Sequence, residues 1–506
     1  MDFKQAKQQL IDLQEKLSAY FHAVSAIHYD GDTAAPKGTA ANRAHTLSIL
    51  SGEIYNLTTS DETVRLLEFL DGCIKGEYAD EADDRLKRMV YLMLKDIREM
   101  QKIPMDEYME YQKLTVEAGD VWHKAKENSD FDLFCPYLEK IFAAKIRFAG
   151  YCAPDSDPYD YWLDQFEPGL NRQICDSFFE TVKARLVPLI KKISKAEQTD
   201  DSFIWGDFDE KKQEELSYFL MDLIGLDFDH VGLSTTEHPF TTSLGSHFDE
   251  RITTNYHREN YTYSMFSVIH EGGHALYDTG SADDLAYTVL DGGVSMGIHE
   301  SQSRFYENII GRSRGFCAAV LPKLKELFPE TMKDVSAEDL YRAVNRTEPT
   351  LIRTEADEVT YCLHVMVRYE LEKQIMAGDI KVRDLPEHWN RMYKEYLGTD
   401  VPDDRRGVLQ DSHWSSGLIG YFPSYALGNA YGAQFFKKMK ETVDVEKCLA
   451  EGDLGPVNEW NRSHIWQYGK CYEPSKILDM ALGEEFDPGV YLDYLEEKYS
   501  DIYGLE

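Results

Sequence analysis

Two histidines and a glutamate stand together in an otherwise apolar stretch, "SVIHEGGHALYDTG", at residues 267–280. His270 and His274 are four residues apart, so on an α-helix both imidazoles would lie on one face, one turn above the other. This His-Glu-x-x-His pattern can bind Zn²⁺ through the two imidazoles, while Glu271 lies beside the ion and accepts a proton from its water. Zinc lowers the pKa of that water toward about 7. The pattern therefore predicts metal-assisted hydrolysis.

Two glycines, Gly272 and Gly273, separate the histidines. Each costs roughly 1 kcal/mol relative to alanine inside a helix, and glycine permits another group to approach the backbone closely. We expect a peptide substrate to lie against the helix at this point. The alternative for the histidines is a structural pair, hydrated or hydrogen-bonded, because so short a pattern also arises by chance.

A zinc site of this kind needs a third protein ligand. Glu300 follows His274 by 26 residues (300 − 274), within "GIHESQSRFYENIIGRSRG" at residues 297–315. This length allows the first helix to end near Gly280 and a second helix to return alongside it. Glu300 would complete a His-His-Glu ligand set, and Glu307, two turns further on, is the rival ligand.

The elements that must position these residues are mostly helical. Apolar residues recur at steps of three and four at Phe3, Ala6, Leu10, Leu13, Leu17, Tyr20 and Val24, at Leu47, Leu50, Ile54 and Leu57, and at Leu86, Met89, Met93, Ile97 and Met100. The last stripe stops before Pro104, as proline requires. This spacing predicts amphipathic helices whose apolar faces pack into a core.

One segment departs from the helical spacing. Residues 233–257, "LSTTEHPFTTSLGSHFDERITTNYH", place threonines and other β-formers on both sides of Gly245 and Ser246. This pattern predicts a small hairpin or a pair of strands beside the helix that carries His270. No linker, repeat or low-complexity tract marks a domain border, so we expect one large, mainly α fold.

The chain is strongly acidic, with 54 Lys and Arg against 90 Asp and Glu among 506 residues, a formal net charge of −36. This charge repels phosphate backbones and anionic membrane surfaces, so neither nucleic acid nor a membrane is an expected partner. The eight cysteines are scattered without a Cys-x-x-Cys pair, which indicates reduced thiols. Without a signal-peptide pattern or an apolar run of about 18 residues, we expect a cytoplasmic protein.

Six motifs follow one another between residues 238 and 414. They are His238-Pro-Phe, Asp249-Glu-Arg251-Ile-Thr, His270-Glu271-Gly-Gly-His274, His299-Glu300-Ser-Gln, Ile352-Arg353-Thr-Glu-Ala-Asp357, and Gly407-Val-Leu-Gln410-Asp-Ser-His413-Trp. Together they resemble the carboxypeptidase Taq family of zinc metallocarboxypeptidases. The upstream segment "DPYDYWLDQFEPGL" (157–170) is also similar to this family, so the resemblance covers most of the chain.

The resemblance implies a large, helical, cleft-shaped fold related to neurolysin and angiotensin-converting enzyme, formed by residues 1–506, with 1–130 as a helical cover over the cleft. It implies removal of C-terminal residues from peptides that have a free C-terminus. Specificity would be broad, with C-terminal proline disfavoured. It further implies one Zn²⁺ per chain, with Co²⁺ also supporting activity, and a homodimer. The third metal ligand of the family corresponds to Glu300.

A carboxypeptidase must recognise a terminal carboxylate, which in so acidic a chain requires a dedicated cation. Arginine suits this task because its planar guanidinium binds a carboxylate through two parallel hydrogen bonds. Arg353 is the first candidate, and the alternative for it is a surface arginine paired with Glu355 or Asp357. Arg251 is the second candidate, although it could simply hold the hairpin through Asp249.

The oxyanion formed from the attacked carbonyl needs neutral hydrogen-bond donors beside the metal. Tyr425 is our first candidate and Tyr421 the second, both in a glycine-rich segment. Other motif residues are expected to bind substrate (His238, Gln410, His413) or to orient the metal ligands (His299, Asp357). For Asp357 we expect a hydrogen bond from the free ring N–H of a ligating histidine.

Two other functions remain open. One is an oligopeptidase that uses the same zinc site to cleave internally or to release dipeptides. The other is a helical peptide-binding protein with a vestigial metal site, against which the intact Glu271 and the complete ligand set argue.

Overall fold

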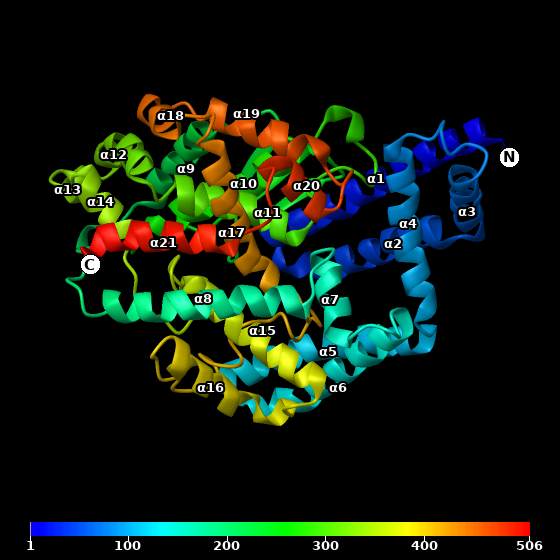
Figure 1. Cartoon of the computed structure of the whole chain (residues 1–506), viewed down its shortest axis with the longest axis horizontal. Helices are drawn as coiled ribbons and strands as arrows, with labels where there is room; N and C mark the ends of the chain where they lie inside the picture. Colours follow the sequence, from blue (N-terminus) through cyan, green and yellow to red (C-terminus); the bar gives the residue numbers. More distant parts are fainter. Residues whose placement is uncertain (1, 506) are drawn as a thin grey trace.

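The computed structural model describes residues 2–505, and the fold is mainly α-helical (Figure 1). The α-helices are α1 (Phe3–Thr33), α2 (Ala40–Thr59), α3 (Asp61–Lys75), α4 (Asp84–Lys102), α5 (Met105–Asn128), α6 (Phe131–Cys152), α7 (Pro158–Phe166), α8 (Arg172–Ile193), α9 (Glu210–Ile224), α10 (Thr262–Thr279), α11 (Met296–Arg304), α12 (Arg314–Leu327), α13 (Pro329–Met332), α14 (Ala337–Val344), α15 (Tyr361–Ala377), α16 (Leu385–Tyr396), α17 (Phe422–Met439), α18 (Val445–Glu451), α19 (Gly455–His464), α20 (Pro474–Leu482) and α21 (Pro488–Tyr503). Short 3₁₀ segments are η1 (Lys37–Thr39), η2 (Ser202–Ile204), η3 (Asp283–Leu285), η5 (Arg353–Glu355), η6 (Val382–Asp384) and η7 (Trp466–Tyr468), whereas η4 (Phe305–Ile310) is π-helical. The prediction of a mainly α fold is confirmed.

A three-stranded sheet lies in the middle of the chain, with β1 (Val231–Thr235), β2 (Thr241–Leu244) and β3 (Ser246–Thr254) in the order β1-β3-β2. The predicted hairpin is β2 and β3, which pair antiparallel. Gly245 joins them with a φ of 78°, a left-handed conformation that favours glycine. β1 pairs parallel to β3, and β3 packs on α10. The sheet therefore lies beside the helix that carries both histidines.

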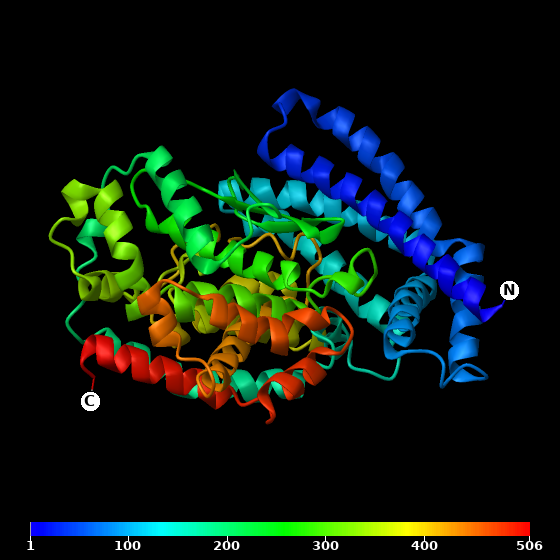
Figure 2. The same ribbon diagram turned by 90° about the horizontal axis from the view of Figure 1, so that it is seen from above.

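Helices α1, α3 and α4 form a hydrophobic core of their own, which extends from Phe3 to Ile97, and α2 packs against it through the half-buried Ile54 and Leu57. In Figure 2, α1 and α2 run side by side along one flank of the molecule. α1 reaches the sheet, where the hydroxyl of Ser18 donates to the carbonyl of Gly245 at 2.6 Å. α5, which completes the predicted 1–130 cover, instead packs into the main core through side chains such as Trp122. The role of this region as a cover over the cleft stays a prediction.

Helices α10, α11 and α17 pack closely at the centre of the main core. A Cβ atom on Gly273 of α10 would lie 2.7 Å from the carbonyl oxygen of Gln302 in α11. A Cβ atom on Gly428 of α17 would lie 2.7 Å from the Cβ of Glu300. Both glycines are needed because two backbones approach each other there. α11 is therefore held between α10 and α17.

The expectation that substrate approaches the two glycines of α10 is wrong. The group that approaches Gly273 is the backbone of α11, and a Cβ on Gly272 would lie 2.5 Å from the Cδ1 of Ile224. Both glycines are buried. Their neighbours come from distant parts of the chain, so the local sequence gave no sign of them.

All eight cysteines are free thiols, as expected. Within residues 2–505, no helix combines the length and the apolar character needed to cross a membrane.

Candidate active site

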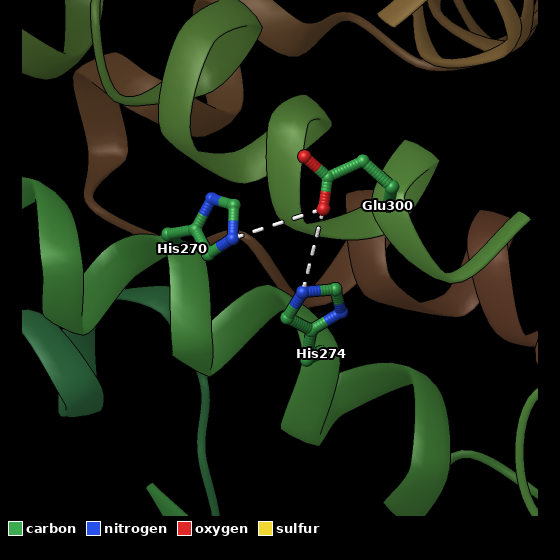
Figure 3. A group of neighbouring side chains, drawn as sticks. All are labelled: His270, His274 and Glu300. Atoms are coloured by element: carbon green, nitrogen blue, oxygen red, sulfur yellow. Dashed lines mark ion pairs between the residues drawn. The ribbon is translucent and has the colours of Figure 1, made fainter. Parts of the chain in front are cut away.

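Three side chains from two adjacent helices converge on one point. His270 and His274 come from α10 and Glu300 from α11 (Figure 3). The Oε2 atom of Glu300 lies 3.8 Å from Nε2 of His270 and 3.6 Å from Nε2 of His274. A tetrahedral zinc ion with bonds of about 2.0–2.2 Å holds its ligand atoms about 3.4 Å apart. The three donors therefore fit a divalent ion, and within residues 2–505 they form the one such group of histidine, cysteine and carboxylate donors.

Glu300 is held in place by its own helix. Nε of Arg304 donates to Oε1 at 2.7 Å, and the hydroxyl of Ser303 donates to Oε2 at 3.1 Å. Arg304 is half-buried and its guanidinium lies 4.2 Å from the ring centre of Tyr361. These contacts turn Oε2 toward the two imidazoles. Arg304 was not predicted from the sequence, although its i+4 spacing from Glu300 is a recognisable signal.

Glu307, the rival ligand, contacts a histidine instead of the metal position. Nδ1 of His270 lies 2.8 Å from its Oε2, and Nδ1–H can donate when Nε2 binds a metal. Arg304 approaches the same oxygen at 3.0 Å. Burial opposes ionisation of Glu307, but Arg304 and His270 keep the pKa of this carboxylate well below its ordinary value. A negative Glu307 fixes the orientation of His270.

The other imidazole is oriented by a second histidine. Nδ1 of His274 lies 2.7 Å from Nδ1 of His299, and Nε2 of His299 lies 3.1 Å from Oδ1 of Asp278. If His274 offers Nε2 to a metal, its Nδ1–H donates to His299, whose Nε2–H in turn donates to Asp278. Burial lowers the pKa of His274 well below its ordinary value, which favours the neutral ring that a metal ligand requires.

His299 is therefore where the sequence analysis placed it, beside a metal ligand, while Asp278 was missed despite lying four residues after His274. Asp357 lies elsewhere. Its carboxylate accepts hydrogen bonds from the backbone N–H groups of Glu348, Val359 and Thr360. Asp357 therefore orders the turn before α15. The Nδ1 atoms of His270 and His274, one of which was expected to contact Asp357, contact Glu307 and His299.

Glu271 is anchored from the sheet. The hydroxyl of Thr241, in β2, lies 2.6 Å from Oε2 of Glu271 and 3.0 Å from its backbone carbonyl. Burial raises the pKa of Glu271 above its ordinary value, whereas His270 and Thr241 work against this rise. Because Glu271 is next to His270 in sequence, its carboxylate lies beside the metal position without belonging to the ligand set. No sequence pattern indicated a role for Thr241.

A cavity of about 740 Å³ opens beside these residues. Its walls include His270, Glu271 and Arg353, together with the aromatic rings of Tyr263 and Tyr361. The cavity therefore joins the metal position to the arginine that the sequence analysis favoured.

Arg353 is buried and paired. Its Nη2 lies 2.9 Å from Oδ1 of Asp411, and its Nη1 donates to the hydroxyl of Tyr361 at 3.1 Å. Asp411 also accepts from the fully buried Arg368, at 2.7 Å from Nε. Two guanidinium groups thus share one carboxylate, which leaves one positive charge uncompensated within this trio. The expected alternative partners Glu355 and Asp357 are not its hydrogen-bond partners among the residues described.

Tyr421, Tyr425 and His413 gather next to Arg353. The hydroxyl of Tyr425 lies 3.3 Å from Nε2 of His413, and the guanidinium of Arg353 lies 5.1 Å from the Tyr425 ring centre. Tyr421 packs edge-on against Tyr425, with ring centres 5.0 Å apart. Gln410 is turned inward, where its Oε1 accepts from the backbone N–H of Arg353 at 2.9 Å. It positions the arginine backbone.

Two of the predicted substrate residues lie apart from this group. Arg251 pairs with Asp249 at 2.7 Å, and its guanidinium lies over the ring of Tyr29 in α1. It holds the hairpin, as the alternative foresaw. His238 is exposed, and its backbone carbonyl accepts from the hydroxyl of Thr236 at 2.9 Å.

Comparison with known proteins extends these observations to the whole chain. Residues 9–499 match the sequence model of the family described as "Carboxypeptidase Taq (M32) metallopeptidase". Carboxypeptidase 1 of Bacillus subtilis is 40% identical over 100% of both chains, and thermostable carboxypeptidase 1 of Thermus thermophilus is 35% identical over 99% of both. The crystal structure of the M32 carboxypeptidase from Deinococcus radiodurans is 33% identical, with a TM-score of 0.95 over 99% of this chain and 100% of that one. The chain belongs to the carboxypeptidase Taq (M32) family of metallocarboxypeptidases.

Proposed function

We propose that this chain is a zinc-dependent carboxypeptidase that hydrolyses the last peptide bond of peptides with a free C-terminus. One observation carries the proposal. The candidate metal ligand His270, the acid beside it (Glu271) and an arginine (Arg353) all line one cavity of about 740 Å³, and His270 forms a group of three candidate ligands with His274 and Glu300. A scissile carbonyl and a terminal carboxylate could therefore be bound at the same time.

His270, His274 and Glu300 would hold the ion, through the two Nε2 atoms and Oε2. When bound, zinc would supply a Lewis acid that polarises the scissile carbonyl and makes water a stronger acid. We expect one Zn²⁺ per chain, with Co²⁺ also active, because two imidazoles and a carboxylate suit both ions.

Glu271 acts as the general base in this proposal. Its carboxylate accepts a proton from the attacking water and later delivers it to the amine that leaves. The hydroxyl of Thr241 holds Oε2 by a hydrogen bond of 2.6 Å, which aims the carboxylate at the cavity. General acid–base catalysis of this kind contributes about 10²–10⁴-fold in rate.

Arg353 would bind the terminal carboxylate. The trio of Arg353, Arg368 and Asp411 carries one net positive charge in a chain whose net charge is −36. Gln410 and Tyr361 hold the arginine through its backbone and its Nη1 atom. The guanidinium is thus prepared for a carboxylate without reorganisation, which favours binding.

Tyr425 is the proposed donor to the oxyanion, with Tyr421 as second choice. Its hydroxyl is held at 3.3 Å by His413, and its ring lies against the guanidinium of Arg353. This arrangement supports a place near the last residue of the peptide. His238 is exposed, and its neighbours Glu237 and Pro239 line the cavity, so it would meet substrate at the rim of the cavity.

The test is a digest of an unmodified peptide and its C-terminally amidated counterpart, followed by mass spectrometry with and without a chelator. The proposal predicts loss of one residue at a time from the free C-terminus, little cleavage of the amide, and no cleavage after metal removal. Internal fragments or released dipeptides would favour the oligopeptidase alternative. Hydrolysis that survives complete metal removal would refute both the carboxypeptidase and the oligopeptidase hypotheses. We expect broad specificity, with C-terminal proline cleaved poorly.

A homodimer in the cytoplasm is part of the proposal. α2 buries none of its side chains and exposes Ile49 and Tyr55. Its only charged residues are Arg43 and Glu53. Two copies of so acidic a chain repel each other least when this nearly uncharged helix of one copy contacts the same helix of the other. This supports a homodimer formed through α2. Ile49→Glu should then convert a dimer to a monomer in analytical ultracentrifugation.

A further inference from the structure

The upstream segment at residues 157–170 has no place in the proposed reaction, yet it contains a buried acid. Glu167 follows α7, and its side chain is 2% exposed. Its Oε2 accepts a hydrogen bond of 2.7 Å from the backbone N–H of Gly297, 130 residues further along the chain. Its Oε1 is buried and has no hydrogen-bond partner among the residues described.

A buried carboxylate with one oxygen that accepts no hydrogen bond does not favour the stability of the fold. Removing it from water is unfavourable unless hydrogen bonds compensate. Burial raises the pKa of Glu167 to about 7, although Ser295 and the N–H of Gly297 lower it in part. An uncharged side chain of similar size would stabilise this core better. The contact with Gly297 therefore calls for another explanation.

Gly297 belongs to the first turn of α11, the helix of Glu300. The first N–H groups of a helix have no partner within it and form its positive end. Ser295 caps the amide of Ile298 at 3.2 Å, and Glu167 binds the amide of Gly297. Glu300 follows Gly297 by three residues, so it lies one turn along on the same side of the helix.

Contacts at the end of α11 and along its side together set its position along its own axis, and those along its side include Trp466, whose Nε1 donates to Oε1 of Gln302 at 2.8 Å. Its neighbours meet it through Gly273 of α10 and Gly428 of α17, where an added Cβ would lie within 2.7 Å of α11. Glycine contacts set the distance between helices, but they resist sliding less than interlocking side chains do. At the end of α11 the contact is tight as well, because a Cβ on Gly297 would lie 2.6 Å from Oε2 of Glu167.

We propose that Glu167 is a positioning residue for the metal ligand Glu300: by holding the amide of Gly297 it fixes the position of α11 along its own axis, and thereby where Glu300 meets the two imidazoles. This inference rests on the proposed function, because it takes Glu300 as a ligand. It assigns the upstream segment to the construction of the metal site.

The test compares metal affinity with stability. Apoprotein is titrated with Co²⁺, whose visible absorption reports its coordination, and the melting temperature of the same apoprotein is measured. Loss of a direct partner of a metal ligand lowers affinity about 10–100-fold; Glu167 acts through the backbone one helical turn away, so we expect a loss at the lower end of this range, about 10-fold, for Glu167→Ala. Glu167→Gln should lose less, because an amide oxygen can still accept from Gly297. Both variants should shift the Co²⁺ absorption bands.

The matched control is Asp164→Asn in the same segment, where the carboxylate accepts from the N–H of Gly169 at 2.8 Å and faces Lys95. It should bind Co²⁺ as tightly as the wild type. Gly297→Ala perturbs the contact from the other side and should weaken binding, but should add nothing to Glu167→Ala, where the space has been opened. If Glu167→Ala fails to fold, Glu167→Gln and Gly297→Ala still show whether the contact affects Co²⁺ affinity.

A merely structural Glu167 would lower the melting temperature of the apoprotein and leave Co²⁺ affinity and spectrum unchanged in every folded variant. That result overturns the inference. Failure of the wild-type apoprotein to bind one ion per chain is a different outcome, because it overturns the proposed function and the inference together.

Discussion

Replacing Gly273 with alanine tests how closely α10 and α11 must approach to build the metal site. The new Cβ would lie 2.7 Å from the carbonyl oxygen of Gln302 and 2.8 Å from the Cα of Ser303, whereas ordinary contact begins at 3.4 Å. The helices must therefore separate by about 0.7 Å, because backbone atoms cannot rotate away. Oε2 of Glu300, now 3.8 Å from Nε2 of His270, would then lie about 4.5 Å away.

This separation exceeds what one ion can bridge, since two bonds of about 2.1 Å reach at most about 4.2 Å even in line. We expect the affinity for Zn²⁺ to fall about 100-fold or more. The fold should persist, because overpacking costs about 1–3 kcal/mol and alanine regains about 1 kcal/mol of helix propensity. Competition titration of the apoprotein against a chelator measures the first quantity and denaturant unfolding the second.

The matched control is Gly272→Ala on the same helix. It gives the same gain in propensity, but its Cβ meets the end of the Ile224 side chain, which can rotate away. We expect near wild-type affinity for this variant. If Gly273→Ala binds zinc as tightly as Gly272→Ala, the geometric reasoning is refuted.

Three further predictions concern the reacting groups and their support. Glu271→Gln should lower kcat about 10²–10⁴-fold with one ion per chain still bound, as metal analysis and peptide kinetics can establish; near-normal turnover would exclude Glu271 as the base. Arg353→Ala should lower kcat/KM for free-acid peptides about 30-fold or more and leave the slow cleavage of amidated peptides unchanged, whereas an equal loss on both would point to a general structural defect. Asp411→Asn should destabilise the fold by about 3–5 kcal/mol at pH 7, because it leaves Arg353 and Arg368 buried without a counter-charge. Burial opposes ionisation of Asp411, but the two arginines keep its pKa well below the ordinary value. Its stabilisation is therefore complete above about pH 5 and is lost as pH falls further, so unfolding free energies at pH 7, 4 and 3 should fall less steeply in the variant than in the wild type.

Local periodicity predicted much of the fold. The stripes that begin at Phe3 and Leu86 are helices α1 and α4, and α4 ends at Lys102, before Pro104. The threonine-rich segment is the β2–β3 hairpin. The parallel pairing of β1 was not predicted, because such pairing joins segments whose contact leaves no trace in local spacing.

For the candidate site too, local spacing predicted some residues, whereas others depended on tertiary contacts. The spacing of His270 and His274 placed both imidazoles on one face, and Glu300 lies across from them. The partners of these residues depended on tertiary contacts. Thr241 reaches Glu271 from the sheet, and neither residue type nor spacing indicated this. Such contacts join elements that lie far apart in sequence, so only the packed structure reveals them.

The same dependence on tertiary contacts explains why some residues have partners other than those expected from the sequence. Asp357, in the same motif as Arg353, was expected to accept a hydrogen bond from a metal-bound histidine. Its carboxylate instead accepts hydrogen bonds from backbone N–H groups just before α15. The arginine beside it, Arg353, pairs with Asp411, which lies 58 residues away. Sequence patterns identify which side chains carry charge, while packing decides which charges meet.

The most direct test of this account is the stoichiometric reconstitution of the metal-free protein. Apoprotein is given increasing Zn²⁺, and the release of single C-terminal residues is followed in the wild type and in His274→Ala. The account predicts that wild-type activity rises in proportion to bound metal and is complete at one ion per chain, with no recovery in the variant at the same metal concentration. Full activity in the metal-free protein, or equal reconstitution of His274→Ala, would contradict it.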